Sequence, residues 1–325
     1  LASFLGRVNY TLADKYILTA SFRSDGSSKF TDENKWATFL SGALAWRASE
    51  EQFIKDLNIF SNLKFRVSYG ETGNQGIGSY RINSQLDTAN FPFGGSLSSG
   101  AADIAWRGPV DPNIKWETTK QWNAGIDFGW FKNRLTLTVD FYWKKTRDLL
   151  QEVIIAPSNG FSNMLTNTGN VTNKGLEITI GATPIDSKDW KWNLNGNIAF
   201  NKNSIGGLEG DQFARTLWYG ADNIFIQRNG CPIGAIYGYV EDGFYNNIQE
   251  VRADPQYTTA KDAVVLSKVG EIKYRDLNGD GAITEADRTI IGDTNPDFTF
   301  GLTNNISWKN LSLSFLLQGS VGNDI

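Results

Sequence analysis

Residues 134–143 have the sequence RLTLTVDFYW, in which apolar and polar side chains alternate. In an extended strand, one face of this segment would carry Leu135, Leu137, Val139, Phe141 and Trp143, and the other face would carry Thr136, Thr138, Asp140 and Tyr142. Similar runs of about 9 to 13 residues recur about ten times along the chain. Strands of soluble sheets are mostly about five or six residues long, whereas strands that cross a membrane need about ten. The pattern therefore predicts an all-β fold, an antiparallel transmembrane β-barrel of the Gram-negative outer membrane.

The composition of the 325 residues agrees with a barrel and excludes a helical membrane protein. Mean hydropathy is −0.33, and no stretch reaches the roughly 18 apolar residues that a membrane-spanning helix needs. A barrel is compatible with this low value because its lumen-facing side chains are polar. Aromatic residues make up 13% of the chain, and aromatic side chains favour the interfaces of a lipid bilayer.

Charge and reactive side chains exclude several functions. The net charge is −4 and no run of Lys and Arg could neutralise a phosphate backbone, so nucleic acid is not an expected partner. The chain has no histidine, which removes the commonest general base and the Ser-His-Asp arrangement. Cys231, the single cysteine, has no second thiol with which to form a disulfide or a zinc site. We therefore expect the protein not to be an enzyme.

The alternating runs predict about ten strands, at residues 2–12, 16–24, 36–47, 63–69, 122–130, 134–143, 176–182, 190–201, 298–308 and 311–317. Connections after the odd-numbered strands are short or of moderate length. In the one at residues 48–62, the apolar residues have the spacing of a short helix. Connections after the even-numbered strands are longer, and the longest span residues 71–115 and 202–295. In outer-membrane barrels, short turns face the periplasm and long loops face outward. These two connections are therefore expected to be extracellular loops.

One soluble alternative shares the alternating pattern. A soluble all-β carbohydrate-binding or adhesion module would use its aromatic residues as a core. The inferred lipid faces carry no charge between their ends, and aromatic residues such as Trp122 and Trp130 lie at those ends. Both features favour the membrane protein.

Several segments, in order along the chain, resemble the SusC/RagA family of TonB-dependent outer-membrane transporters. They are RVNY at 7–10, LTASFR at 18–23, DGSSKF at 25–30, RVSYG at 66–70, TGNQ at 72–75, KWE at 115–117, GIDFG at 125–129, YWKKT at 142–146, NKGLE at 173–177, YGY at 237–239 and DG at 242–243. Each segment alone is weak, but their joint occurrence in this order covers nearly the whole chain and is highly specific.

The resemblance implies a 22-stranded barrel, the size known for plugged outer-membrane transporters. It further implies a plug domain, a segment that contacts the TonB complex, and a SusD-like surface lipoprotein that closes over the extracellular mouth. The nutrient would be an oligosaccharide, with a peptide as the second choice. Residues 1–325 would then be an internal part of the barrel domain, without the signal peptide and the plug.

The sequence DLNGDGAITEAD at residues 276–287 follows the spacing of a calcium-binding loop. The oxygen ligands would come from Asp276, Asn278, Asp280, the Ala282 carbonyl and Asp287. Asp287 stands where such loops usually have a bidentate Glu, and a shorter carboxylate reaches less far. We predict a structural Ca²⁺ here; the alternative is a surface turn that binds no metal.

Two further sets of side chains are candidates for weaker roles. Trp106, Trp116 and Trp218 lie in or beside the long connections and could stack on sugar rings, or could pack the loops against themselves. Asp127, Asp140 and Glu177 are expected to point into the lumen, where they would join solvated networks with Lys and Arg.

Overall fold

The computed structural model describes residues 1–82, 86–93, 96–103, 108–156, 158, 161, 163–214 and 224–324. The chain divides into two compact units. The first, here called the sheet unit, comprises Leu1–Glu209 and Pro296–Gly322. The second, here called the loop unit, comprises Gly210–Asn295 and Asn323–Ile325.

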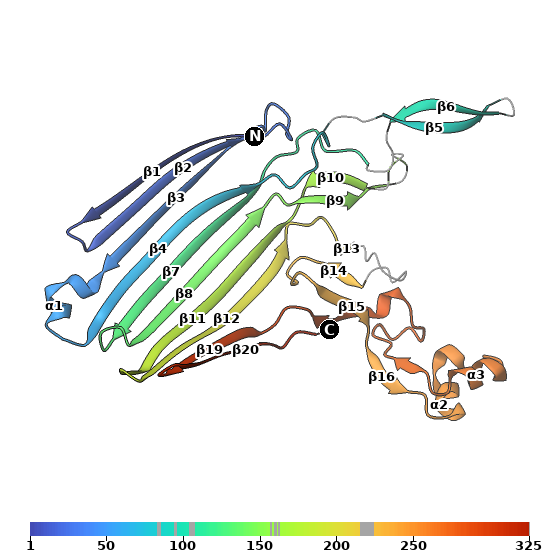
Figure 1. The fold of residues 1–325 in the computed structure, drawn as a ribbon. Coiled ribbons are helices and arrows are strands. Elements are labelled where there is room, and N and C mark those ends of the chain that lie inside the picture. Colours follow the sequence, from blue (N-terminus) through green and yellow to red (C-terminus); the bar gives the residue numbers. More distant parts are fainter. Residues whose placement is uncertain are drawn as a thin grey trace. The chain divides into compact units, whose positions relative to one another are not determined.

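Ten strands form one antiparallel sheet in the order β1-β2-β3-β4-β7-β8-β11-β12-β19-β20. Their bounds are Ala2–Leu12 (β1), Tyr16–Gly26 (β2), Trp36–Arg47 (β3), Phe60–Asn74 (β4), Glu117–Trp130 (β7), Leu135–Arg147 (β8), Asn170–Asp186 (β11), Trp190–Gly206 (β12), Phe298–Trp308 (β19) and Leu311–Val321 (β20). Each strand lies beside the next sheet strand along the chain (Figure 1). The predicted barrel wall of about ten strands is confirmed.

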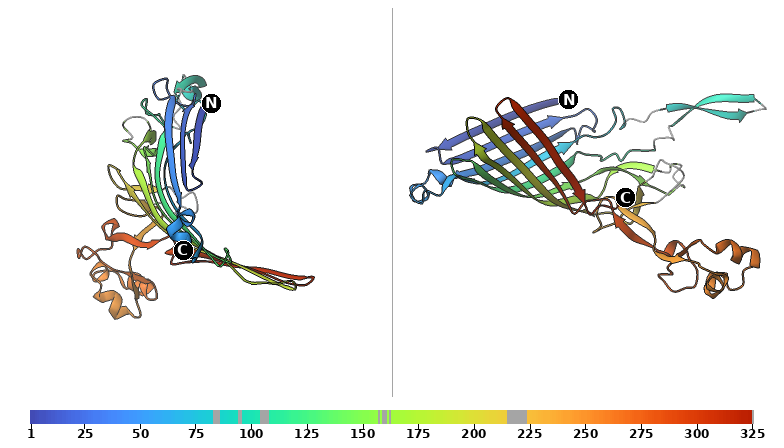
Figure 2. Two further views of the ribbon diagram at one scale, coloured as in Figure 1. Left: turned by 90° about the vertical axis from the view of Figure 1, so that its left-hand side faces the viewer. Right: turned by 60° about the horizontal axis from the view of Figure 1, so that its bottom comes forward.

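The two faces of this sheet differ as the alternation predicts. Large apolar side chains on one face are exposed, including Leu44 at 61%, Phe141 at 52% and Leu313 at 59%. The strand registers align this face across the sheet, so that Ile126, Val139 and Ile178 are direct neighbours. A soluble sandwich would bury such a face in its core, whereas a barrel presents it to lipid. We call it the outer face, and the opposite polar face of the curved sheet (Figure 2) the inner face.

The short turns and the predicted helix lie together at one end of the sheet (Figure 1). The helix is α1 (Gln52–Lys55), preceded by a 3-10 turn at Ala48–Glu50. Beside it, Glu51 accepts hydrogen bonds from Lys15 Nζ at 2.8 Å and from Tyr16 Oη at 2.7 Å, which lower the pKa of its carboxyl group. Hydrogen bonds therefore link the turn between β1 and β2 to the connection between β3 and β4.

The connections at the other end contain structure that the alternation did not predict. The connection after β4 contains the hairpin of β5 (Leu86–Phe93) and β6 (Ser96–Asp103), and the one after β8 contains the hairpin of β9 (Leu150–Ile154) and β10 (Asn163–Asn167).

The loop unit occupies most of the connection between β12 and β19, predicted as an extracellular loop. Its sheet has the order β13-β14-β15-β18, with bounds Gln212–Ala214, Phe225–Gln227, Ala235–Tyr239 and Arg288–Asp293. A second pair joins β16 (Glu241–Phe244) to β17 (Ile272–Tyr274), and α2 (Ile248–Ala253) and α3 (Asp262–Lys268) pack around buried Tyr245, Val251 and Val265. No helix among the described residues has the length and apolarity needed to cross a membrane.

Candidate functional site

The inner face carries a three-residue charged network across β4, β7 and β8. Arg66 Nε and Nη2 donate to the two carboxylate oxygens of Asp127, each at 2.9 Å, and Nη2 also donates to Asp140 Oδ2 at 3.1 Å. Thr138 Oγ1 adds a third donor to Asp127 at 3.1 Å. The bidentate contact is the strong form of an Arg–carboxylate pair. The expectation that the inner carboxylates join networks with Arg or Lys holds for these two.

Gly125 makes room for the network. It lies between Arg66 and Asp140 in the strand registers, and a Cβ atom there would lie 2.3 Å from Asp140 Oδ1 and 2.7 Å from Arg66 Nη2. Arg66 can therefore reach across β7 only because that position has no side chain. Glu177, opposite Asp140 in the β8–β11 register, joins no ion pair among the described residues.

Replacing Arg66 with methionine should destabilise the sheet. The change leaves two neighbouring carboxylates without their cation, and the side chains of Arg66 and Asp127 are only 30% and 21% exposed. Loss of a fully buried partner costs roughly 3–5 kcal/mol, and partial access of water reduces this to about 1–3 kcal/mol. The midpoint of thermal loss of the folded, heat-modifiable form of the full-length protein should fall. Arg7→Met, an exposed inner-face arginine on β1, is the matched control and should leave it unchanged.

Away from this network, hydroxyl and amide side chains predominate on the inner face. Thr19 Oγ1 donates to Asn9 Oδ1 at 2.9 Å, and Ser314 Oγ donates to Asn305 Oδ1 at 2.7 Å. A hollow of about 440 Å³ on β1 to β4 is lined by hydroxyl side chains such as Ser21 and Ser41 and by charged ones, including Arg23 and Glu71. Such a wall offers both donors and acceptors to a polar solute.

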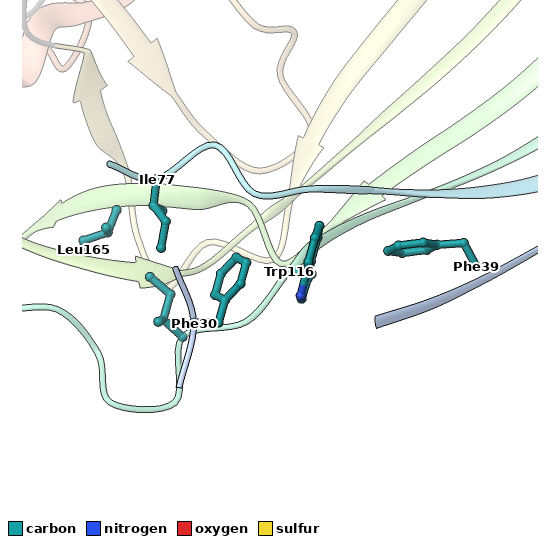
Figure 3. Packing of buried hydrophobic residues seen from close by; sticks show 6 residues of the cluster. Phe30, Phe39, Ile77, Trp116 and Leu165 are labelled. Carbon is teal, nitrogen blue, oxygen red and sulfur yellow. The ribbon is translucent and has the colours of Figure 1, made fainter. Parts of the chain in front are cut away.

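Trp116 lies in a buried cluster that joins the connections at the long-loop end, together with Phe30, Phe39, Ile77, Ile114 and Leu165 (Figure 3). Only 6% of Trp116 is exposed, and its ring centre lies 5.2 Å from Phe30 and 6.0 Å from Phe39. Its Nε1 donates to the Lys35 carbonyl at 3.4 Å. Trp116 therefore packs the loops against one another, as in the second of the two roles predicted for it. Trp106 and Trp218 lie outside the described residues.

Phe30 and Phe39 were not singled out by the sequence, although they complete this cluster. The only available signal was the apolar Phe30 inside a polar connection, which is a weak one. The cluster is further tied by the Asn167 amide, which donates from Nδ2 to the carbonyls of Lys115 at 2.9 Å and Asp148 at 2.7 Å.

The predicted calcium loop is closed by hydrogen bonds from its own backbone. Asp276 accepts from the amides of Gly279 at 2.6 Å and Gly281 at 2.7 Å, and Gly281 has the positive φ of 83° expected at the sharp turn. Asn278 Nδ2 donates to Asp280 Oδ2 at 3.0 Å. The side chains predicted at the first, third and fifth ligand positions therefore lie close together.

The carboxylate of Asp287, the predicted ligand at the last position of the loop, already accepts several hydrogen bonds from the protein. It is fully buried, and its two oxygens accept from the amides of Leu277, Asn278 and Thr284 and from the Thr284 hydroxyl. These bonds, led by that from the Thr284 amide, hold the pKa of Asp287 below its usual value. A carboxylate has about four lone-pair positions, so a metal ion would have to displace one of these donors. The described residues contain no group of three or more His, Cys, Asp or Glu side chains placed to hold a metal.

The calcium site thus stays a prediction with a direct test. Asp276→Ala combined with Asp280→Ala should abolish calcium uptake by the full-length protein in titration calorimetry, because both carboxylate ligands are lost. The barrel should stay folded, since the loop unit is separate from the ten-stranded sheet. Absence of calcium uptake by the unmodified protein would instead establish a metal-free turn.

Comparison with known proteins gives consistent matches. The family described as "TonB dependent receptor-like, beta-barrel" matches residues 2–315. TonB-dependent receptor P3 of Formosa agariphila is 39% identical over 336 residues, covering 100% of this chain and 32% of that protein. TonB-dependent receptor SusC of Bacteroides thetaiotaomicron is 37% identical over 331 residues, covering 99% of this chain and 31% of that protein. The chain therefore spans about a third of the length of these curated relatives.

Solved structures agree with the sequence matches. The RagAB peptide importer in its open-open state superposes with a TM-score of 0.79 at 25% identity, covering 99% of this chain and 32% of that chain. Another RagAB peptide transporter structure gives a TM-score of 0.77 at 26% identity, covering 98% and 33%. The curated relatives are receptors rather than enzymes.

Proposed function

Because the chain belongs to the TonB-dependent receptor-like β-barrel family, which resides in the outer membrane, we propose that it forms part of a transporter that imports an oligosaccharide. The observation that most directly supports this proposal is the contrast between the two faces of the ten-stranded sheet. The outer face is apolar and exposed, as at Leu44, whereas the inner face carries hydroxyl and amide groups that hydrogen-bond to each other, as between Thr19 and Asn9 and between Ser314 and Asn305. An oligosaccharide needs many neutral donors and acceptors along its path, and this wall supplies them.

A peptide is the second candidate substrate. RagAB, which resembles this chain at 25% identity, is described as a peptide importer. The paired charges of Arg66, Asp127 and Asp140 on the inner face would suit the charged side chains and termini of a peptide. Neutral hydroxyl and amide pairs such as Thr19–Asn9 and Ser314–Asn305 lie on the same face as these charges, and on that ground we favour the oligosaccharide.

Uptake measurements separate the two substrates. Cells that lack the full-length transporter would be complemented with it and given either a panel of neutral oligosaccharides or a panel of tryptic peptides. We expect complementation to restore oligosaccharide uptake, and removal of TonB to abolish it again. Restored peptide uptake alone would favour the second candidate, and restoration of neither would reject import of both classes.

We also assign the long connections to contact with a SusD-like surface lipoprotein. Buried Ile77, Ile114 and Trp116 of the connection after β4 pack in one cluster with Phe30 and Leu165 of two other connections, so these connections can present one ordered surface. Shortening the segment 83–107 keeps these residues and removes β5 and β6. Co-purification with the lipoprotein should weaken while the barrel stays folded and heat-modifiable. Unchanged co-purification and uptake would remove this segment from the interface.

A further inference from the structure

At the long-loop end of the outer face, basic side chains gather on four neighbouring strands. They are Lys120 on β7, Lys145 and Arg147 on β8, Lys174 on β11 and Lys202 on β12. Strand alternation places all five on the outer face, because each is an even number of residues from an outer-face side chain of its own strand: Trp122 on β7, Trp143 on β8, Leu176 on β11 or Phe200 on β12. We call these five residues the outer basic cluster.

The strand registers bring like charges directly opposite each other. Lys120 faces Lys145 across β7 and β8, and Lys174 faces Lys202 across β11 and β12. Like charges opposite one another destabilise a sheet unless a counter-charge lies between them. Lys120 is paired with Glu71 at 2.9 Å. Lys145, Arg147, Lys174 and Lys202 join no ion pair in the part of the chain that the structure describes, so four cations in the cluster have no counter-charge there.

The cluster lies next to the band of aromatic residues at the outer end of the lipid face. Trp143 is the direct cross-strand neighbour of both Trp122 and Lys174, and the Trp122 ring lies 4.8 Å from that of Tyr69. Aromatic residues of this kind mark the depth of the lipid headgroups. A lysine stem can lie along the apolar wall while its ammonium group reaches the headgroup layer.

We infer that the outer basic cluster binds the phosphate groups of a phosphorylated lipid of the outer leaflet, of the lipid A type. Neighbouring strands are about 4.8 Å apart, so the cluster spans roughly 14 Å of the barrel circumference. A phosphate monoester carries about −1.5 to −2 charges at neutral pH and supplies the missing anion. The inference rests on location in the outer membrane and not on which nutrient is imported.

The test compares two triple variants of the full-length protein in mild detergent. Lys145→Gln, Lys174→Gln and Lys202→Gln remove three charges from the outer basic cluster. Lys64→Gln, Lys144→Gln and Lys191→Gln remove three charges from inner-face positions of β4, β8 and β12. Native mass spectrometry would measure binding of phosphorylated lipid A, and heat-modifiability would confirm folding of both variants.

Each cation beside an anionic lipid surface contributes about a fivefold gain in binding, so the outer variant should bind roughly 100-fold more weakly. The inner variant should bind phosphorylated lipid A as tightly as the unmodified protein does. Lipid A without its phosphates should bind the unmodified protein weakly, about as weakly as phosphorylated lipid A binds the outer variant. Equal binding by both variants would overturn the inference. It would also fail if inorganic phosphate at equal concentration displaced the lipid completely, or if the outer variant lost a protein partner while keeping the lipid.

Discussion

Val139→Arg is expected to prevent assembly of most of the barrel. Val139 lies in the central row of the outer face, directly opposite Ile126 and Ile178. An arginine at the midplane of the bilayer costs roughly 2–4 kcal/mol, because its charge must be held in hydrocarbon. The fraction of full-length protein that reaches the heat-modifiable form in outer-membrane preparations measures the effect.

The adjacent residue supplies the control for this change. Thr138 points to the inner face and donates to Asp127 at 3.1 Å, so Thr138→Arg places a cation beside a carboxylate in a wide aqueous lumen. Assembly of Thr138→Arg should be close to that of the unmodified protein. If both variants assembled equally well, the outer face would not be in contact with lipid.

Trp116→Ala should open the loop cluster while leaving the strands paired. Removing a buried tryptophan costs about 3–5 kcal/mol, since contacts are lost and a cavity remains. Trp116 packs on Phe30 and Phe39 and is only 6% exposed. Hydrogen exchange at residues 27–35, 108–116 and 163–168 of the full-length protein should become faster, because all three segments border this cluster.

A lipid-facing tryptophan serves as the comparison. Trp122 is 50% exposed on the outer face, so Trp122→Ala should leave exchange in those three segments unchanged. Slow exchange in the Trp116→Ala variant would mean that the loops are held by their hydrogen bonds, such as those of Asn167, rather than by the cluster.

Strand positions could be predicted from sequence where the chain crosses the bilayer, because only there do the two faces meet different solvents. The expected bounds of β1, β3 and β19 agree with the structure. The central strands are longer than expected: β4 was predicted at 63–69 and extends over Phe60–Asn74, and β11 was predicted at 176–182 and extends over Asn170–Asp186. Beyond the bilayer both faces are wet, so backbone pairing continues without an alternating signal.

The inner network shows what alternation alone leaves undetermined. The sequence places Arg66, Asp127 and Asp140 on one face, but the carboxylates that Arg66 reaches depend on strand register. Register is set by turn geometry and by matching of apolar rows, and a slip of one residue would reverse the faces. The loop cluster is even harder to predict from the sequence, because Phe30 and Trp116 belong to different connections and no periodic pattern links them.

The same cluster determines how an antibody would recognise the long-loop end of the sheet unit. Apart from Phe39 on β3, its buried residues come from three connections that are far apart in the sequence, so neighbouring exposed residues also belong to different segments. Epitopes on this surface are therefore discontinuous. A synthetic peptide copied from one connection would lack the adjoining segments and compete poorly. Serum raised against the folded protein would lose most of its binding to this surface once the chain is denatured.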